Sequence, residues 1–87
     1  MAHVWVPSLL RDLTGGRATV EAAGRTVGAV LDDLDAKYPG MKARLLENGA
    51  LVPGMQVLVD GSAAQLGLRE PVGEQSELHF VPALAGG

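Results

Sequence analysis

The sequence contains no cysteine, few aromatic residues and no excess of basic residues. The absence of cysteine excludes a disulfide framework, a thiolate zinc site and a cysteine nucleophile. Seven lysines and arginines against ten acidic residues give a net charge of −3, which removes the main electrostatic driving force for binding nucleic acid. No apolar run approaches the roughly 18 residues of a membrane span, and the N-terminus lacks a signal-peptide pattern. We therefore expect a cytoplasmic protein that binds neither nucleic acid nor a membrane.

What remains is the composition of one small globular domain. The chain has 87 residues, of which 47% are hydrophobic and 20% charged. Its core must be aliphatic, because the only aromatic residues are Trp5, Tyr38 and Phe80. We expect this domain to span residues 1–82 and to be followed by a flexible tail over residues 83–87.

Hydrophobic periodicity predicts strands separated by one clear helix. Alternating apolar residues predict strands at residues 3–7, 17–23, 55–60 and 77–82, with a brief further strand near Leu68. The predicted helix begins after Thr26, a good N-cap, and its apolar residues recur at helical spacing: Val27, Val30, Leu31 and Leu34.

Proline and glycine mark the end of this helix and of the segment that follows it. The helix ends at Tyr38-Pro39-Gly40, residues 41–47 favour another helical turn, and Asn48-Gly49 ends that segment. The predicted fold class is α+β, with one main helix on one face of a mixed four- to five-stranded sheet. The predicted core comprises Val4, Val6, Val20, Val27, Val30, Leu31, Leu34, Val57, Val59, Leu78 and Phe80.

Residue types that could carry chemistry are present but not in catalytic or metal-binding patterns. His3 and His79 have no third ligand at a suitable spacing, so two half-exposed strand histidines are the better interpretation. Asp32, Asp33 and Asp35 lie on the predicted helix, where neighbouring side chains diverge, and we interpret them as a solvated face. No phosphate-binding loop and no nucleophile elbow is present. We therefore predict no metal site, no bound cofactor and no autonomous active site.

The chain ends in Gly86-Gly87, which chance would give in about one chain in 200. A frayed terminus is the ordinary interpretation of such a pair. Glycine has a chemical use here, however, because a tail without side chains can enter a narrow channel of a partner enzyme. Its α-carboxylate is ionised at neutral pH and can attack the α-phosphate of ATP. Cβ atoms at the last two positions would block that approach.

The order of the predicted elements and the C-terminal octet over residues 80–87 (FVPALAGG) resemble the ubiquitin-like β-grasp sulfur carriers (ThiS/MoaD-like proteins). These include the small subunit of molybdopterin synthase and the thiamin-pathway carrier. The segment over residues 76–81 also resembles the last strand of ubiquitin. Residues 6–11, followed by Thr14-Gly15-Gly16, look most like the carrier that serves a cysteine synthase.

The resemblance implies a β-grasp fold and a carrier rather than an enzyme. Gly87 would be adenylated by an E1-like enzyme that uses ATP and Mg²⁺, and then converted to a thiocarboxylate that donates sulfur to a biosynthetic enzyme. Gly86, Ala85 and Leu84 would give the tail access to its partners. The resemblance does not identify the pathway, which could lead to cysteine, molybdopterin or a secondary metabolite.

Two alternatives to a sulfur carrier stay open at this point. A protein modifier would join Gly87 to target lysines through an isopeptide bond, and it too begins with adenylation. A stand-alone binding module would have an inert tail, so deletion of Gly86 and Gly87 would change nothing.

A partner-binding surface is predicted on the face of the sheet that the helix leaves open. Strand alternation places Trp5, Leu58, His79 and Val81 opposite the residues that pack on the helix. In a β-grasp order the strands that carry them are neighbours, so these side chains should cluster. Uncovered apolar groups of this size are typical of an interface, and an exposed tryptophan is a typical anchor.

Overall fold

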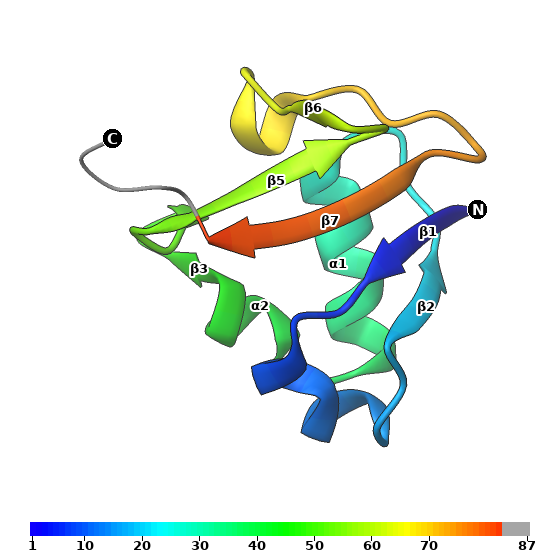
Figure 1. Ribbon diagram of the computed structural model, residues 1–87, viewed down its shortest axis with the longest axis vertical. Coiled ribbons are helices and arrows are strands. Elements are labelled where there is room, and N and C mark those ends of the chain that lie inside the picture. Colours follow the sequence, from blue (N-terminus) through cyan, green and yellow to red (C-terminus); the bar gives the residue numbers. More distant parts are fainter. Residues whose placement is uncertain (83–87) are drawn as a thin grey trace.

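The computed structural model describes residues 1–82, and the expectations for the tail lie outside these residues. Five strands form one sheet, and α1 lies across one face of it (Figure 1). The elements, in chain order, are β1 (Ala2–Trp5), η1 (Ser8–Thr14), β2 (Thr19–Ala22), α1 (Val27–Lys37), α2 (Met41–Leu45), β3 (Leu46–Glu47), β4 (Ala50–Leu51), β5 (Met55–Val59), β6 (Ser62–Ala63), η2 (Gly67–Arg69) and β7 (Glu77–Pro82).

The sheet has the strand order β2-β1-β7-β5-β6, so the last strand in sequence lies in the middle. β7 pairs in parallel with β1 and antiparallel with β5, while β1 pairs antiparallel with β2. A parallel pair between the first and last strands requires a long connection between them, and α1 lies within it. The sheet is therefore mixed, and the predicted α+β class is confirmed.

Helix α1 begins and ends where the sequence predicts. The Thr26 Oγ1 accepts a hydrogen bond from the Ala29 N–H at 3.1 Å, which satisfies one of the free donors of the first turn. At the other end the Tyr38 N–H donates to the Leu34 carbonyl, and Pro39 follows. The predicted apolar stripe of α1 is entirely buried.

The core lies between α1 and the sheet and is aliphatic, as expected. All predicted core residues are buried except Val59, which is half-buried near the edge strand β6 and packs against the core. Other buried side chains lie outside the predicted core set. These include Leu10 from η1, Met41 and Leu45 from α2, and Val72.

Two sequence predictions differ from the structure. The strand expected near Leu68 is wrong: Leu68 lies in the turn η2, where the Glu70 carboxylate accepts a hydrogen bond from the Leu66 N–H at 3.1 Å. The edge strand is β6, joined to β5 by the two-residue turn Asp60-Gly61, whose φ angles of 51° and 85° suit a hairpin. The segment between the predicted strands at residues 3–7 and 17–23, for which no helix is predicted, contains the helical turns of η1.

Candidate functional site

The strand that leads to the tail is the central strand of the sheet. β7 has a strand on each side, and its last residue, Pro82, pairs with Met55 of β5. The predicted tail over residues 83–87, with its predicted site residues Leu84, Ala85, Gly86 and Gly87, lies outside the described residues. The structure therefore shows the platform from which the tail leaves: the C-terminal end of a central strand.

The start of β7 is fixed by Asp60, which the sequence analysis did not single out. Its carboxylate accepts hydrogen bonds from the Glu77 N–H at 2.9 Å and from the Ser76 hydroxyl at 2.8 Å. The Ser76 Oγ in turn accepts from the Gly73 N–H at 2.8 Å. These donors, the Glu77 N–H first and the Ser76 hydroxyl second, lower the pKa of Asp60 from its ordinary value of 3.8. The charged carboxylate thus holds the register of the strand that leads to the tail.

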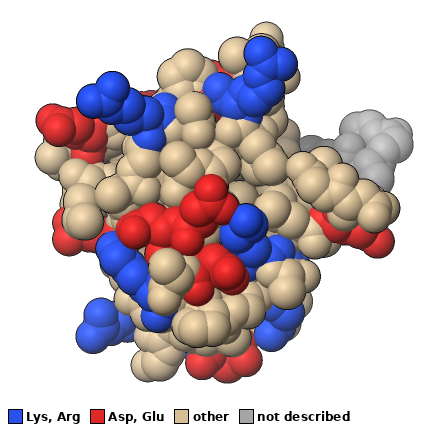
Figure 2. Space-filling model, turned by 180° about the vertical axis from the view of Figure 1, so that it is seen from behind, with Lys and Arg blue, Asp and Glu red and all other residues tan. Residues whose placement is uncertain are grey.

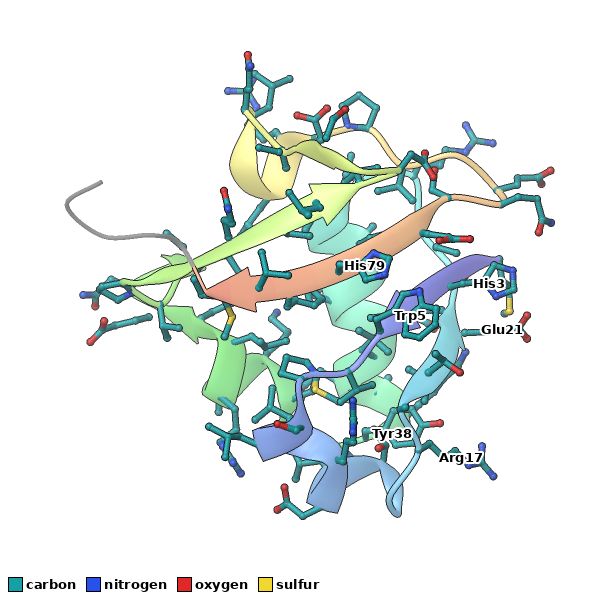
Figure 3. The ribbon with its side chains drawn as sticks, viewed as in Figure 1. His3, Trp5, Arg17, Glu21, Tyr38 and His79 are labelled. Carbon is teal, nitrogen blue, oxygen red and sulfur yellow. The ribbon has the colours of Figure 1, made fainter. Side chains whose placement is uncertain are left out.

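The predicted open-face residues form one cluster, which we call the open-face cluster: Trp5, Leu58, His79 and Val81. Trp5 and His79 are paired across β1 and β7, and their rings stack with centroids 5.1 Å apart and planes 13° from parallel (Figure 3). Leu58 is the partner of His79 on the other side, in β5. Val81 lies two residues further along β7, on the same face and nearer the tail. Trp5 is 43% exposed, so the cluster is open to a partner.

The two histidines do not converge on one site. Strand register places His3 beside Glu77 and His79 beside Trp5. His3 Nδ1 lies 3.7 Å from the Glu21 carboxylate, and its Nε2 lies 3.4 Å from the Gln75 side-chain oxygen. Among residues 1–82, no three histidine or acidic side chains gather in a way that could hold a metal ion.

The acidic residues of α1 serve the fold. Asp33 accepts a hydrogen bond from the Ala23 N–H at 2.9 Å and pairs with Lys37, and these contacts lower its pKa in that order. Asp32 pairs with Lys42 at 2.6 Å, and Asp35 accepts from the Lys42 N–H at 3.0 Å. Figure 2 shows the resulting mixture of acidic and basic side chains on the side of the molecule opposite the view of Figure 1. These carboxylates lie at the surface, as predicted. They also accept hydrogen bonds from Ala23, before α1, and from Lys42, in α2.

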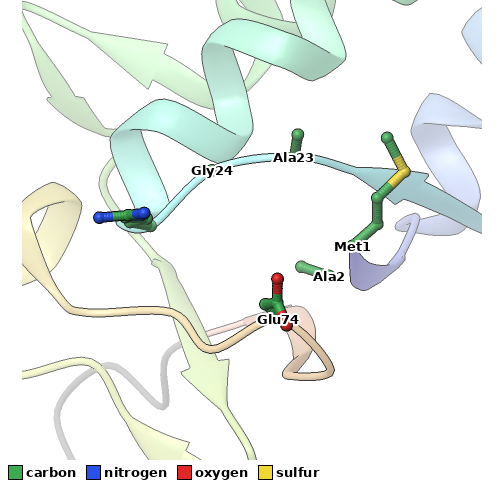
Figure 4. Close-up of a pocket in the computed structure, with 6 residues that line it drawn as sticks. Met1, Ala2, Ala23, Gly24 and Glu74 are labelled. Carbon is green, nitrogen blue, oxygen red and sulfur yellow. The ribbon is translucent and has the colours of Figure 1, made fainter.

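Two of the cavities in the described part of the chain lie at opposite ends of the sheet. One, of about 230 Å³, lies where β1 begins and β2 ends, and is lined by Met1, Ala2, Ala23, Gly24, Arg25 and Glu74 (Figure 4). The other, of about 330 Å³, lies at the C-terminal end of β7 and is lined by Pro7, Ser8, Leu9, Gly54, Met55 and Phe80. We call the second the root pocket, because it lies where the chain leaves the sheet toward the tail. The sequence analysis missed it, although Pro7 and Gly54 mark the chain reversals that form it.

No helix within residues 1–82 is long and apolar enough to cross a membrane.

Comparison with known proteins places this geometry in a family. Residues 4–87 match the ThiS family. The chain is 35% identical over 89 residues to the sulfur carrier protein CysO of Mycobacterium tuberculosis and of Mycobacterium bovis, which covers 97% of this chain and 96% of theirs. It is also 36% identical over 64 residues to small archaeal modifier protein 3 of Haloferax volcanii, covering 71% of this chain and 70% of that protein.

Solved structures agree with the sequence match. The crystal structure of the Amycolatopsis orientalis BexX/CysO complex matches with a TM-score of 0.90 and 36% identity, covering 100% of both chains. That of Mycobacterium tuberculosis CysO matches with a TM-score of 0.89 and 30% identity, covering 97% of this chain and all of that one. SAMP1 of Haloferax volcanii matches with a TM-score of 0.71 and 30% identity, covering 99% and 98%. The predicted resemblance is confirmed: the chain belongs to the ThiS family of ubiquitin-like β-grasp sulfur carriers, and it is a carrier protein and not an enzyme.

Proposed function

We propose that the sulfur travels on the α-carboxylate of Gly87 as a thiocarboxylate. The observation that carries this proposal is the family match, which continues through the glycine pair to Gly87. The proposal takes Gly87 as the last residue of the working chain.

The chemistry takes place in two steps on a partner enzyme. A carboxylate oxygen of Gly87 attacks the α-phosphorus of ATP, and the bond to pyrophosphate breaks, which leaves an acyl-adenylate. Hydrosulfide ion then attacks the acyl carbon: a C–S bond forms, the C–O bond to AMP breaks, and loss of the S–H proton to solvent leaves the thiocarboxylate. The E1-like partner supplies ATP and Mg²⁺, so this chain binds no cofactor of its own. ATP is a cytoplasmic reagent, and we place the protein in that compartment.

At least two partners bind the folded domain: the activating enzyme and a sulfur-accepting biosynthetic enzyme. A relative has been crystallised in a BexX/CysO complex, which supports a direct protein partner for this chain as well. The open-face cluster is the surface we assign to such docking, because its stacked Trp5 and His79 form a fixed aromatic anchor. Leu58 extends the apolar area across β5, and Val81 extends it along β7 toward the tail.

Intact mass spectrometry of the protein purified from its own host tests the proposal. Replacement of oxygen by sulfur adds nearly the same mass as oxidation of one of the three methionines, so the sample must also be treated with a thiocarboxylate-specific alkylating reagent. We expect a fraction of the chain to be alkylated at Gly87. A chain that carries only methionine oxidation, even when purified with its activating enzyme, would refute the thiocarboxylate.

A protein modifier is the second candidate, and the similarity to small archaeal modifier proteins favours it. In that case the amine of a target lysine attacks the acyl carbon in place of sulfur, the bond to AMP breaks, AMP and a proton leave, and an isopeptide bond forms. An immunoblot of the host lysate separates the two functions, since a modifier gives a ladder of larger conjugates that disappears when Gly86 and Gly87 are deleted.

A further inference from the structure

The root pocket is an apolar cavity at the point where the tail leaves the domain. It lies between the Pro7–Leu9 segment and the Gly54–Met55 segment, and Phe80 of β7 also lines it. Met55 lines the pocket and is also the strand partner of Pro82, the last residue of β7. The pocket is therefore continuous with the base of the tail.

The pocket exists because β1 stops short of β7. The last pair between the two strands is Trp5 with His79, and β7 continues for three more residues. Beyond Trp5 the chain turns toward β2, where the Val6 N–H donates to the Ala18 carbonyl at 2.7 Å, and η1 begins at Ser8. This departure leaves a gap beside the end of β7 that no described strand fills.

Leu9 stands at the rim of the root pocket and is 83% exposed, the largest exposure among the large apolar side chains described. Its backbone is nevertheless fixed, because Arg44 Nη2 donates to the Leu9 carbonyl at 2.9 Å. The next residue, Leu10, is buried, and its N–H donates to the Pro7 carbonyl at 2.9 Å. An apolar side chain presented on a backbone fixed in this way loses little conformational entropy on binding, which is typical of an interface anchor.

The residues that line the root pocket indicate which kind of group can bind in it. None of the six lining residues is charged, so no side-chain charge favours an anion or a metal ion in the pocket. Its volume of about 330 Å³ lies at the lower limit of small-molecule sites and accommodates one or two large apolar side chains. An enzyme that draws the tail into a channel must close on the end of β7, and this brings its surface against the pocket.

We propose that the root pocket receives an aliphatic or aromatic side chain of the adenylating enzyme, while Leu9 inserts into that enzyme's surface. This contact is separate from the open-face cluster. It would hold the end of β7 at the entrance of the enzyme's channel, into which the tail extends. The inference rests on the proposed function, and it names a second contact surface for the same partner.

The test is ATP–pyrophosphate exchange by the E1-like enzyme of the same host, with the full chain as the carboxylate substrate. Leu9→Glu places a charge on the apolar anchor, and Ser8→Phe fills the pocket without deleting a contact. We expect each variant to raise the KM for the carrier at least tenfold and to leave kcat at saturating carrier unchanged, because the tail itself is intact. Circular dichroism verifies that both variants fold.

Matched controls place the same changes elsewhere on the surface. Leu66→Glu alters another exposed leucine, and Ser62→Phe alters an exposed serine of the edge strand β6; both should keep the wild-type KM. A folded Leu9→Glu variant with wild-type KM would overturn the inference and leave the proposed function standing. A lower KM would also overturn it, by indicating that the pocket holds the chain's own Leu84. A wild-type chain that supports no exchange would overturn the proposed function itself, and this inference with it.

Discussion

Asp60 holds Glu77 through two hydrogen bonds of opposite direction. The Asp60 N–H donates to the Glu77 carbonyl at 2.8 Å, and the Asp60 carboxylate accepts from the Glu77 N–H at 2.9 Å. Asp60 lies in the turn that ends β5, so this turn alone fixes the backbone of Glu77, the first residue of β7. This clamp holds the end of β7 opposite to the end from which the tail leaves.

The first prediction concerns Asp60 and pH. The folded state lowers the pKa of Asp60 below 3.8, so the carboxylate contributes stability that is fully present above that value and is lost as the pH falls through the folded pKa. At pH 7 we expect Asp60→Asn to lower the free energy of unfolding by about 1–2 kcal/mol, since charge-assisted hydrogen bonds are lost. The difference from wild type should be constant above about pH 5 and shrink below about pH 4. Urea unfolding at a series of pH values measures it.

Asp12→Asn is the matched control, because Asp12 makes only a surface ion pair with Arg44 at 3.8 Å. Its effect at pH 7 should stay within about 0.5 kcal/mol. An Asp60→Asn variant that loses the same free energy at pH 3 as at pH 7 would mean that the charge on Asp60 is not what holds β7.

The second prediction concerns the core beneath the sheet. Leu31 of α1 is fully buried, so Leu31→Ala leaves a cavity between helix and sheet and should lower the free energy of unfolding by about 2–5 kcal/mol. Leu66→Ala, at a position that is 59% exposed, should change it by less than about 0.5 kcal/mol. Denaturant unfolding followed by circular dichroism compares the two. Similar midpoints for both variants would contradict the assigned helix register.

The sequence predicts those parts of the fold in which local signals agree with burial. The N-cap Thr26, the apolar stripe of α1 and the alternation along β7 each point to one structure, and all are confirmed. The prediction of a strand near Leu68 is wrong because a few apolar residues do not locate an edge strand. Edge strands are short, and their side chains are exposed. The better signal was Asp60-Gly61, a typical hairpin pair that directly follows the apolar alternation of the predicted strand over residues 55–60.

The site is predicted in part, for a similar reason. Strand alternation alone places Trp5 and His79 on the same face, and the stacking of the two rings confirms the expected clustering. The root pocket and Leu9 could not be found in this way, because they depend on where β1 ends relative to β7. That offset is a property of strand register, and the periodicity of one strand carries no information about its partner.

The third prediction concerns the tail. Gly86→Val adds a β-branched side chain next to the proposed reactive residue, which restricts φ and widens the tail. We expect it to abolish thiocarboxylate formation, measured by alkylation and intact mass, while circular dichroism shows an unchanged domain. Ala83→Val is the control: it makes a β-branched change three residues earlier and should keep most of the thiocarboxylate. A normal yield from Gly86→Val would remove the glycine pair from the mechanism.

The last prediction concerns the open-face cluster. Leu58 is half-buried beside His79, and Leu58→Asp would place a charge in the apolar surface that a partner must cover. Desolvation of that carboxylate opposes binding, so we expect the dissociation constant for the E1-like enzyme to rise at least tenfold, which corresponds to about 1.4 kcal/mol. Titration calorimetry measures it, with Leu66→Asp as an equally charged control on an exposed leucine outside the cluster. Circular dichroism must show that Leu58→Asp folds, because Leu58 belongs to the strand next to β7. If the folded variant binds as tightly as wild type, the open-face cluster takes no part in docking, and the tail with its root pocket must account for recognition alone.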